Sequence, residues 1–442
     1  MPLAGFPIDK RSALLLDKEN MTKYSISPMS SLYELYLRHP RISTDSRRIE
    51  PDSVFFALRG ASFDGNRFAA DALEKGAAYA VVDDPAAVSG DRTVLVGDTL
   101  EALQELAREY RRELAIPILA ISGSNGKTTT KELVSRVLAE RFEVYATHGN
   151  LNNHIGVPLT LLAMTRDTEF GVVEMGASAC GEIALLASIA EPNYGILTNI
   201  GRAHLEGFGG PEGIRRGKGE LLDYLAANGG RAFVPREDQT LTNMAAERDG
   251  LAAEYYSVTL ADGIAHHLEG DYNRFNIAAA VAVGRYFDID GERIRHAVGS
   301  YMPDNNRSQR TETERNTLIV DCYNANPSSM RASVLNFLAE PAGGRSRRVL
   351  ILGDMLELGA WSEQEHRDIV ALAARNPDAE LMLVGGEFAR ACADMEPQPA
   401  NTALFPSREE LIAELRRRPV ENAFVLVKGS RGIGLEKALE EL

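Results

Sequence analysis

The sequence predicts an α/β protein of three domains whose central domain is built on a mostly parallel sheet. Two observations predict this class. Short apolar runs alternate with amphipathic helical stretches along most of the 442 residues. The run at 118–121 is apolar throughout, as in strands buried on both faces, and it leads directly into the glycine-rich stretch 122–130. A chain of this length accommodates about three domains of roughly 150 residues each.

The N-terminal domain is predicted at residues 29–115 as a small α/β unit. Three β-rich runs alternate with helical patterns there, and a longer helical pattern at 99–115 precedes Pro117 at the first domain boundary. The β-rich runs are 53–58, 79–84 and 93–98. Residues 1–28 show no clear periodicity and are left unassigned.

The central domain is predicted at residues 116–306, with a P-loop-type sheet. Its buried strands are expected at 118–121, 170–176 and 194–201. Residues 231–270 are polar and poorly patterned, and a helix is expected at 276–287. The C-terminal domain, at 307–442, repeats strand and helix in a Rossmann-like order. Its strands are expected within 317–327, 348–355, 379–386 and 422–430.

Composition excludes several classes of function. The formal charge of −15 argues against nucleic acid or an anionic membrane as a partner. The groups that bind an anionic ligand must therefore be local ones. The three cysteines form no CxxC pair, which argues against a disulfide framework or a thiolate zinc site and fits a reducing cytoplasm. No apolar run reaches the ~20 residues of a membrane span, and no targeting signal is recognised. The surface offers no dimer signal, so a monomer is expected.

The stretch "SGSNGKTTT" has the features of a phosphate-binding loop between a strand and a helix. Gly123 and Gly126 permit a tight backbone, Lys127 supplies a charge for the β- and γ-phosphates, and the Thr128 hydroxyl suits Mg²⁺. The common P-loop spacing would require glycine at position 121, which is Ile121. The alternative is a glycine turn with a surface lysine.

Two further residues follow apolar strands. Glu174 ends the run "FGVVE", where a carboxylate faces the ligand crevice and suits Mg²⁺, although a strand-end glutamate can simply meet solvent. His204 follows the next strand, and a lone histidine there is more often structural than a metal ligand.

Taken together, these residues resemble the Mur ligase family of ATP-dependent amide-forming enzymes. The family's phosphate loop is the shorter GxxGK[ST][ST] type, which reads "GSNGKTT" here and accounts for Ile121. The resemblance implies ATP and two Mg²⁺ ions, one held by Thr128 and Glu174 and the other approached by His204 and a carbamylated Lys218. By itself, Lys218 would be interpreted as a solvated helix lysine.

Five motifs resemble the member of the family that adds the terminal dipeptide. They are "THGNLNNHIGVPLTLL", "EMGASACGEI", "DCYNANPSSM", "ILGDMLELG" and "VLVKGSRG". The resemblance implies that D-alanyl-D-alanine is joined to UDP-N-acetylmuramoyl-tripeptide through an acyl phosphate in peptidoglycan precursor synthesis. A sister ligase, a folate polyglutamate ligase and a non-enzymatic nucleotide switch remain alternatives, although the "DNPR" signature of the sister enzyme is absent.

The resemblance also assigns roles to individual residues. The implied catalytic residues are Lys127, Glu174, His204, Lys218 and Arg307. The implied ATP-binding residues are Gly123, Ser124, Asn125, Gly126, Lys127, Thr128, Thr129, Asn273, Asn276, Arg307 and Asp321. Tyr272 stands where the adenine motif usually has histidine, and Asn276 could alternatively cap a helix.

Substrate roles follow in the same way. The UDP moiety is assigned to Ser46, Arg47 and the "DGNRF" turn, and the central cleft to Asn150, Asn152, Asn153, Tyr323, Asn324 and Asn326. Recognition of the dipeptide is assigned to Asp354, Lys428, Ser430 and Arg431. For these last residues, salt bridges between domains are an equal alternative.

Overall fold

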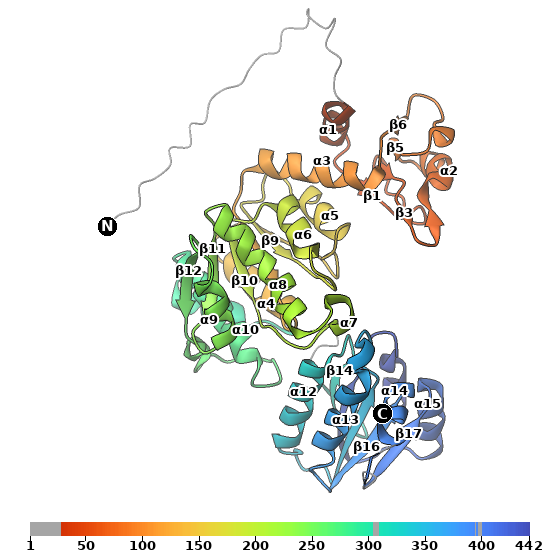
Figure 1. Ribbon diagram of the computed structural model, residues 1–442, viewed down its shortest axis with the longest axis vertical. Helices are drawn as coiled ribbons and strands as arrows, with labels where there is room; N and C mark the ends of the chain where they lie inside the picture. Colours follow the sequence, from red (N-terminus) through yellow and green to blue (C-terminus); the bar gives the residue numbers. More distant parts are fainter. Residues whose placement is uncertain (1–27, 304–308, 394, 397–399) are drawn as a thin grey trace, which may run out of the picture.

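The computed structural model describes residues 28–303, 309–393, 395–396 and 400–442. Three sheets follow one another along the chain, each with helices around it, which confirms the predicted α/β class (Figure 1). Among the described residues no helix is long and apolar enough to cross a membrane.

The N-terminal sheet has the strand order β1-β2-β5-β6, and all of its pairs are parallel. Its strands are β1 (Ile42–Ser43), β2 (Val54–Phe56), β5 (Tyr79–Val82) and β6 (Thr93–Leu95), with a separate hairpin of β3 (Arg59–Gly60) and β4 (Phe63–Asp64). The helices are α1 (Pro28–Arg38), α2 (Ala69–Glu74) and α3 (Thr99–Leu114), and the 3-10 turns are η1 (Gly65–Phe68) and η2 (Pro85–Ala87).

Helix α3 joins the N-terminal sheet to the central domain. Asp98 caps its first turn, and Ala115 ends it in the left-handed conformation. Its apolar face packs against helices of the central domain in one continuous core, and it crosses the gap between the two sheets (Figure 1). The Tyr110 hydroxyl donates to the carbonyl of Met164 at 2.8 Å, which ties the helix to the central domain. The N-terminal sheet is thereby held against the body that carries the phosphate loop.

The central sheet is entirely parallel, with the order β12-β11-β10-β7-β9-β8. Its strands are β7 (Ile118–Ser122), β8 (Val144–Ala146), β9 (Phe170–Glu174), β10 (Tyr194–Leu197), β11 (Arg231–Pro235) and β12 (Ala252–Tyr256). Alternate residues of β7 face opposite sides: Ile118 and Ala120 belong to one apolar core, Leu119 and Ile121 to the other. The sheet is therefore buried on both faces, as the apolar strands predict.

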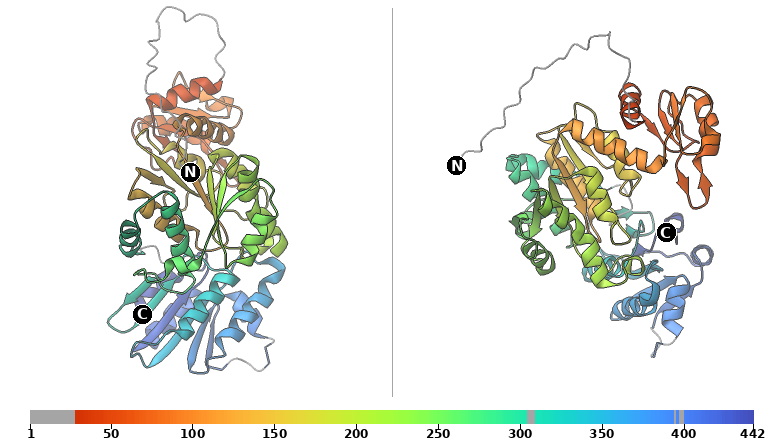
Figure 2. Two further views of the ribbon diagram at one scale, coloured as in Figure 1. Left: turned by 90° about the vertical axis from the view of Figure 1, so that its left-hand side faces the viewer. Right: turned by 45° about the horizontal axis from the view of Figure 1, so that its top comes forward.

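Helices cover both faces of this sheet (Figure 2). On one face lie α5 (Gly156–Leu162), α6 (Glu182–Ala190), α8 (Pro211–Ala227) and α9 (Gln239–Ala246); on the other lie α4 (Lys127–Ala139), α10 (Asn273–Tyr286), α11 (Gly291–Gly299) and η3 (Val258–Ala261). The one-turn helix α7 (Leu205–Phe208) follows β10. Residues 231–270, which are poorly patterned in the sequence, hold β11, α9 and β12. β12 is an edge strand with four half-buried residues, so its sequence carries little apolar alternation.

The C-terminal sheet has the order β13-β14-β18-β15-β16-β17, and only the β13–β14 pair is antiparallel. Its strands are β13 (Gln309–Glu312), β14 (Thr317–Asp321), β15 (Arg347–Gly353), β16 (Ala379–Val384), β17 (Thr402–Phe405) and β18 (Ala423–Lys428). One face is covered by α12 (Pro327–Ala339), α13 (Ser362–Ala373) and α14 (Gly386–Ala393), the other by α15 (Arg408–Arg417) and η5 (Leu435–Glu441); η4 (Gly359–Trp361) precedes α13. The register pairs Asp321 with Lys428, so two strand ends meet at one point.

Replacing Leu106 of α3 by alanine tests whether the shared core holds the first two domains together. Leu106 is fully buried in that core, so the substitution is expected to lower the free energy of unfolding by about 2–5 kcal/mol. The matched control is Leu95→Ala, because Leu95 is 46% exposed and should change it by less than ~0.5 kcal/mol. Urea denaturation of both variants measures the difference, and equal midpoints would contradict the shared core.

Candidate active site

A cleft of about 660 Å³ lies between the central and C-terminal domains. Its walls come from the carboxyl ends of β7, β9 and β10, from the start of α10, from the loop after β14, and from the end of β18. In open α/β sheets ligands bind at this edge, because the loops that follow the strands converge there. The cleft is therefore the candidate active site.

Most of the residues singled out in the sequence line this cleft. They are Ser124, Asn125, Gly126, Lys127, Thr128, Thr129, Asn150, Asn152, Asn153, Glu174, His204, Asn273, Asn276, Asp321, Tyr323, Asn324, Asn326 and Lys428. Gly123, Ser46, Arg47, Lys218, Asp354, Ser430 and Arg431 are not part of the lining. Arg307 lies outside the described residues.

The phosphate loop is tied to the segment that follows β10. Gly123 has φ +134°, and a Cβ there would come within 2.1 Å of the Thr198 hydroxyl oxygen, so only glycine fits. The backbone N–H of Ser124 donates to the carbonyl of Asn199 at 3.0 Å, and that of Asn125 donates to the Asn199 side chain at 3.1 Å. Two neighbouring strand ends thus set the conformation of the loop.

Lys127 begins helix α4, and its ammonium group lies over the loop. It donates to the carbonyls of Gly123 at 2.9 Å and Ser124 at 3.2 Å. The N–H groups of the first turn of α4 and its positive end meet at the same place, which suits phosphate oxygens. Thr128 is buried and also lines the cleft. Both glycines of the loop have positive φ, as a phosphate cradle requires.

Helix α10 packs against the phosphate loop through its asparagines. Thr130 donates to the side-chain oxygen of Asn276 at 3.1 Å, and Asn276 donates in turn to Asn273 at 2.7 Å. Asn276 lies inside α10, which begins at Asn273, so the interpretation of Asn276 as a helix cap is wrong. Its role is to join helix α10 to the loop.

Glu174 is the last residue of β9 and is 2% exposed. One carboxylate oxygen accepts a hydrogen bond from Asn152 at 2.8 Å. The other, Oε2, is buried and has no hydrogen-bond partner among the described residues. A buried carboxylate oxygen without a partner is costly, and a cation would relieve that cost. The carboxylate of Glu174 therefore fits an oxygen-preferring metal ion.

Lys218 lies in α8 and is 1% exposed, so its interpretation as a solvated helix lysine is wrong. Its amine donates to the carbonyl of Ala177 at 2.9 Å and lies 5.1 Å from the centre of the Phe208 ring. Burial lowers the pKa of this amine well below its ordinary value, and the positive charge of Lys127 lowers it further. Compared with an exposed lysine, the protonated form of Lys218 is therefore disfavoured.

His204 lies on the cleft wall with its backbone in the left-handed conformation, at φ +54°. Its Nδ1 contacts the carboxylate of Glu357 in the C-terminal domain. Burial lowers the pKa of the imidazole, Glu357 opposes that shift, and the cations Lys127 and Lys218 add to it. Lys127 and Lys218 thus lie close enough to His204 for their charges to disfavour its protonation.

The C-terminal wall combines an ion pair with a contact to the phosphate loop. Lys428 is 1% exposed and lies 2.6 Å from the carboxylate of Asp321, which also accepts from Ser333 at 2.8 Å. Asn326 caps helix α12 and donates to the side chain of Asn125 at 2.7 Å. The C-terminal domain therefore reaches the phosphate loop directly.

Three of the predicted substrate residues have other partners. Asp354 accepts hydrogen bonds from the backbone N–H groups of Glu387 and Phe388, each at 2.9 Å, at the start of α14. The hydroxyl of Ser430 donates to the carbonyl of Ala325 at 3.2 Å. The guanidinium of Arg431 lies 5.0 Å from the centre of the Tyr323 ring.

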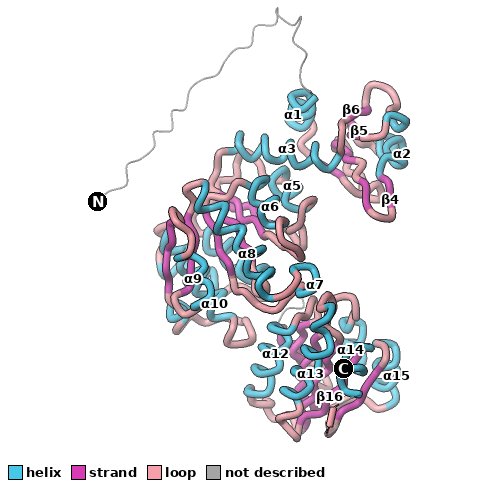
Figure 3. Tube along the Cα trace, in the orientation of Figure 1, coloured by secondary structure: helices cyan, strands magenta, loops and turns pink. Residues whose placement is uncertain are grey.

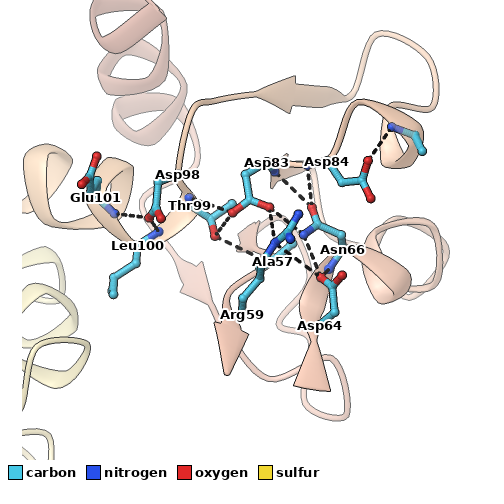
Figure 4. A network of polar contacts seen from close by, with 11 residues as sticks. Ala57, Arg59, Asp64, Asn66, Asp83, Asp84, Asp98, Thr99, Leu100 and Glu101 are labelled. Atoms are coloured by element: carbon cyan, nitrogen blue, oxygen red, sulfur yellow. Dashed lines mark hydrogen bonds and ion pairs between the residues drawn. The ribbon is translucent and has the colours of Figure 1, made fainter. Parts of the chain in front are cut away.

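The residues predicted for UDP lie in the N-terminal domain. The guanidinium of the exposed Arg47 forms two hydrogen bonds with Asp45, at 2.8 and 2.7 Å, and this pairing lowers the pKa of Asp45. In the "DGNRF" turn, Asn66 donates to the carboxylates of Asp64 at 2.8 Å and Asp83 at 2.7 Å (Figure 4). This polar network fixes the turn beside the strand β5.

Sequence reasoning missed part of the cleft wall. Thr198 and Asn199 line it, although "TNIG" follows an apolar strand in the same way that Glu174 does, so the same signal could have found them. Glu182 and Asp238 also line it, and neither ends an apolar strand. Only the fold brings those two carboxylates to this cleft.

The fold and the cleft define a nucleotide-binding α/β protein whose phosphate loop is contacted by a second domain. Three family models match the chain. They are "Mur ligase family, catalytic domain" at residues 40–111, "Mur ligase middle domain" at 121–265 and "Mur ligase, glutamate ligase domain" at 306–431. The chain belongs to the Mur ligase family.

Two relatives that match over 90% of the chain are ligases of one kind. The UDP-N-acetylmuramoyl-tripeptide–D-alanyl-D-alanine ligase of Bacillus subtilis is 34% identical, with 91% of this chain and 92% of that protein covered. The Escherichia coli enzyme of the same name is 33% identical, with coverages of 91% and 93%.

Two crystal structures are also similar. MurF of Acinetobacter baumannii matches with a TM-score of 0.80 and 29% identity, over 91% of this chain and 93% of that one. MurF of Thermotoga maritima in complex with ADP matches with a TM-score of 0.79 and 25% identity, over 92% and 97%.

Replacing Gly126 by alanine tests whether the loop needs its close approach to α10. Gly126 has φ +78°, and a Cβ there would lie 2.6 Å from the side-chain oxygen of Asn276. The variant is expected to bind a non-hydrolysable ATP analogue about tenfold more weakly or worse, because strain of ~1–2 kcal/mol must be relieved by moving the loop.

Gly229→Ala is the matched control for this substitution. Gly229 has a similar φ of +69°, but a Cβ at this position would meet no atom of the described residues within 4 Å, so the backbone strain is the same without the contact. Titration calorimetry with the ATP analogue should give the wild-type affinity for this control. Equal affinities for both variants would contradict the importance of the contact.

Proposed function

We propose that this protein is an ATP-dependent ligase that joins D-alanyl-D-alanine to UDP-N-acetylmuramoyl-tripeptide in peptidoglycan precursor synthesis. The observation that carries the proposal is the match of over 90% of the chain to ligases named for this reaction. The cleft supports it, because its phosphate loop faces groups from a second domain. A cytoplasmic location and a monomeric state remain predictions from the sequence.

ATP is proposed to bind with its phosphates on the loop 123–129 and its adenosine toward α10. The structure of the Thermotoga maritima relative is a complex with ADP. Because the two folds are similar, this supports nucleotide binding by the present protein. Asn273, Asn276 and Tyr272 lie on the cleft wall at the start of α10, where they can contact the base. Asp321, across the cleft, is proposed for the ribose.

Magnesium is proposed to be held by Thr128 and Glu174, with His204 and Lys218 near a second ion. Among the described residues, no three His, Cys, Asp or Glu side chains cluster as a complete metal site. This suits Mg²⁺, which is commonly held by one or two carboxylates together with substrate phosphates and water. When bound, Mg²⁺ would offset negative charge on the phosphates during phosphoryl transfer.

Carbamylation of Lys218 is proposed because it would replace a positive charge by a negative one beside the metal site. An ammonium group beside Lys127 would repel a metal ion, whereas a carbamate would supply an anionic oxygen ligand. Carbon dioxide reacts with a neutral amine, and burial favours that form of Lys218. The nitrogen attacks the carbon of CO₂, an N–C bond forms as the electron pair of one C=O π bond moves to oxygen, and one proton leaves the nitrogen.

The reaction is proposed to proceed in two steps. A carboxylate oxygen of the tripeptide attacks the γ-phosphorus of ATP, the bond from that phosphorus to the ADP oxygen breaks, and an acyl phosphate forms. The amine of D-alanyl-D-alanine then attacks the acyl carbon, phosphate leaves, and the nitrogen loses a proton. Lys127 holds the transferring phosphoryl group, and the two domains exclude water from the cleft.

All three domains are proposed to contribute to binding of UDP-N-acetylmuramoyl-tripeptide and D-alanyl-D-alanine. Ser46 and Arg47 are proposed for the UDP moiety, and the asparagines Asn150, Asn152 and Asn153 for the sugar and peptide. On the C-terminal side, Tyr323, Asn324, Asn326 and Lys428 line the cleft and are proposed to contact the substrates directly. Asp354, Ser430 and Arg431 are proposed for recognition of D-alanyl-D-alanine, although they are not part of the lining of the cleft.

ATP turnover is expected to require both peptide substrates. ADP release measured with UDP-N-acetylmuramoyl-tripeptide and D-alanyl-D-alanine together should exceed the rate with either one alone by at least about a hundredfold, because the acyl phosphate needs its acceptor amine. Lys127→Ala is the control and should abolish this turnover. ADP release that is independent of both substrates would defeat the ligase proposal and favour a nucleotide switch.

The carbamate is expected to be visible by ¹³C NMR in protein equilibrated with ¹³C-bicarbonate near pH 7.5. Because burial lowers the pKa of Lys218, its amine should react at a pH where an ordinary lysine, with a pKa of about 10.4, stays protonated. The carbamate signal should vanish in Lys218→Arg, and activity should fall about 10- to 100-fold.

Lys131→Arg is the matched control for the carbamate experiment. Lys131 is also buried, at 2% exposure, but its ammonium group is held by the carbonyl of Thr147 at 2.6 Å and by Glu132 at 2.8 Å. The carbamate signal should persist in this variant. A wild-type spectrum without the signal, or a signal that survives Lys218→Arg, would contradict the assignment.

A further inference from the structure

The segment after β10 forms the main polar contact between the central and C-terminal domains. Helix α7 lies beside the C-terminal domain at η4 (Figure 3). The contact includes His204 with Glu357, the backbone N–H of Glu206 donating to the carbonyl of Glu357 at 3.3 Å, and Arg202 with Glu365 at 2.6 Å. Leu205 and Phe208 are buried in the apolar core of the C-terminal domain. A wall of the active site is thus packed into the neighbouring domain.

Both members of the His204–Glu357 contact have an unfavourable backbone conformation. His204 has φ +54° and Glu357 has φ +62°, and neither is a glycine. Each such residue costs on the order of 1 kcal/mol, which the surrounding structure must offset. Two strained residues that face each other across a domain interface indicate a contact with a specific purpose.

The contact uses one of the two imidazole nitrogens. Nδ1 of His204 contacts the carboxylate of Glu357, and His204 lines the cleft. When a carboxylate accepts the proton of Nδ1, the other nitrogen, Nε2, is left as the acceptor or metal ligand, and the orientation of the ring is fixed. Glu357 is 61% exposed, so its charge is screened by water and adds little attraction by itself. Its effect is therefore on the tautomer and direction of the ring.

We propose that Glu357 of the C-terminal domain is a positioning residue for His204, which it holds with Nε2 directed into the nucleotide–metal site. The site is then complete only when the C-terminal domain is docked, because one domain supplies the ligand and the other orients it. This inference rests on the nucleotide–metal site proposed above, but not on the identity of the peptide substrates.

The experiment measures binding of Mn²⁺, as a probe for the metal, to the full-length protein with saturating ADP, by electron paramagnetic resonance. Glu357→Ala is expected to weaken Mn²⁺ binding about tenfold. Glu357→Gln keeps a hydrogen-bond acceptor for Nδ1–H and should bind within about threefold of the wild type. In a His204→Ala background, Glu357→Ala should have no further effect, because the residue acts through the histidine.

Glu365→Ala is the control for domain docking. It removes the partner of Arg202 at the same interface, but Glu365 does not line the cleft. Its Mn²⁺ affinity should remain within about twofold of the wild type. An equal loss in Glu365→Ala, or an undiminished effect of Glu357→Ala in the His204→Ala background, would overturn the proposal, because Glu357 would then act by docking or by touching the metal itself.

A second measurement on the metal-free protein tests the tautomer. In protein labelled with ¹⁵N-histidine, the His204 resonances should report a proton on Nδ1, and Glu357→Ala should shift the population toward the Nε2-protonated form. Unchanged resonances in that variant would contradict the proposal. If Mn²⁺ with ADP does not bind the wild-type protein at all, the nucleotide–metal site itself fails; if binding behaves as expected but no peptide is joined, only the proposed ligase activity fails.

Discussion

The buried carboxylate of Glu174 is the constraint on which the active site depends. One of its oxygens has no hydrogen-bond partner among the described residues, although the side chain is 2% exposed. A negative charge in that position would be stabilised by a cation. The chain as a whole carries a charge of −15, so it attracts no polyanion at long range. The loop, the helix dipole of α4 and Lys127 must therefore attract the triphosphate locally, and the proposed metal ion would offset the charge of Glu174 beside it.

The active site lies at the carboxyl edge of the central sheet, and more than one domain contributes to it. The phosphate loop is shaped by the end of β10 and contacted by Asn326 of the C-terminal domain. The segment that carries His204 is buried in the core of that domain. Helix α3 fixes the N-terminal sheet on the other side of the central body. A reaction that combines a nucleotide with two further substrates requires such an arrangement, because the reacting atoms must meet in a dry cleft.

Local patterns in the sequence predicted the fold class and the phosphate loop, because a buried strand, two glycines and an amphipathic helix are adjacent in the chain. Functional residues at the ends of strands were the next most predictable feature, because an apolar run marks the strand. Glu174 and Lys428 each follow such a run. The edge strands β12 and β17 were missed, since half-exposed strands lose apolar alternation. Partners distant in sequence were not predictable. Asp354 follows a strand as a ligand would, yet it accepts hydrogen bonds at the start of α14, and nothing near His204 in the chain indicates Glu357.

The central claim is that this cleft activates a carboxylate by phosphorylating it. Transfer of ¹⁸O tests that claim most directly, because the oxygen that attacks ATP leaves with the phosphate. UDP-N-acetylmuramoyl-tripeptide labelled with ¹⁸O in its reacting carboxylate would be incubated with ATP, D-alanyl-D-alanine and the protein, and the released phosphate analysed by mass spectrometry. The account predicts ¹⁸O in the inorganic phosphate, in proportion to the peptide joined. Phosphate without ¹⁸O would contradict it, since ATP would then have been hydrolysed by water.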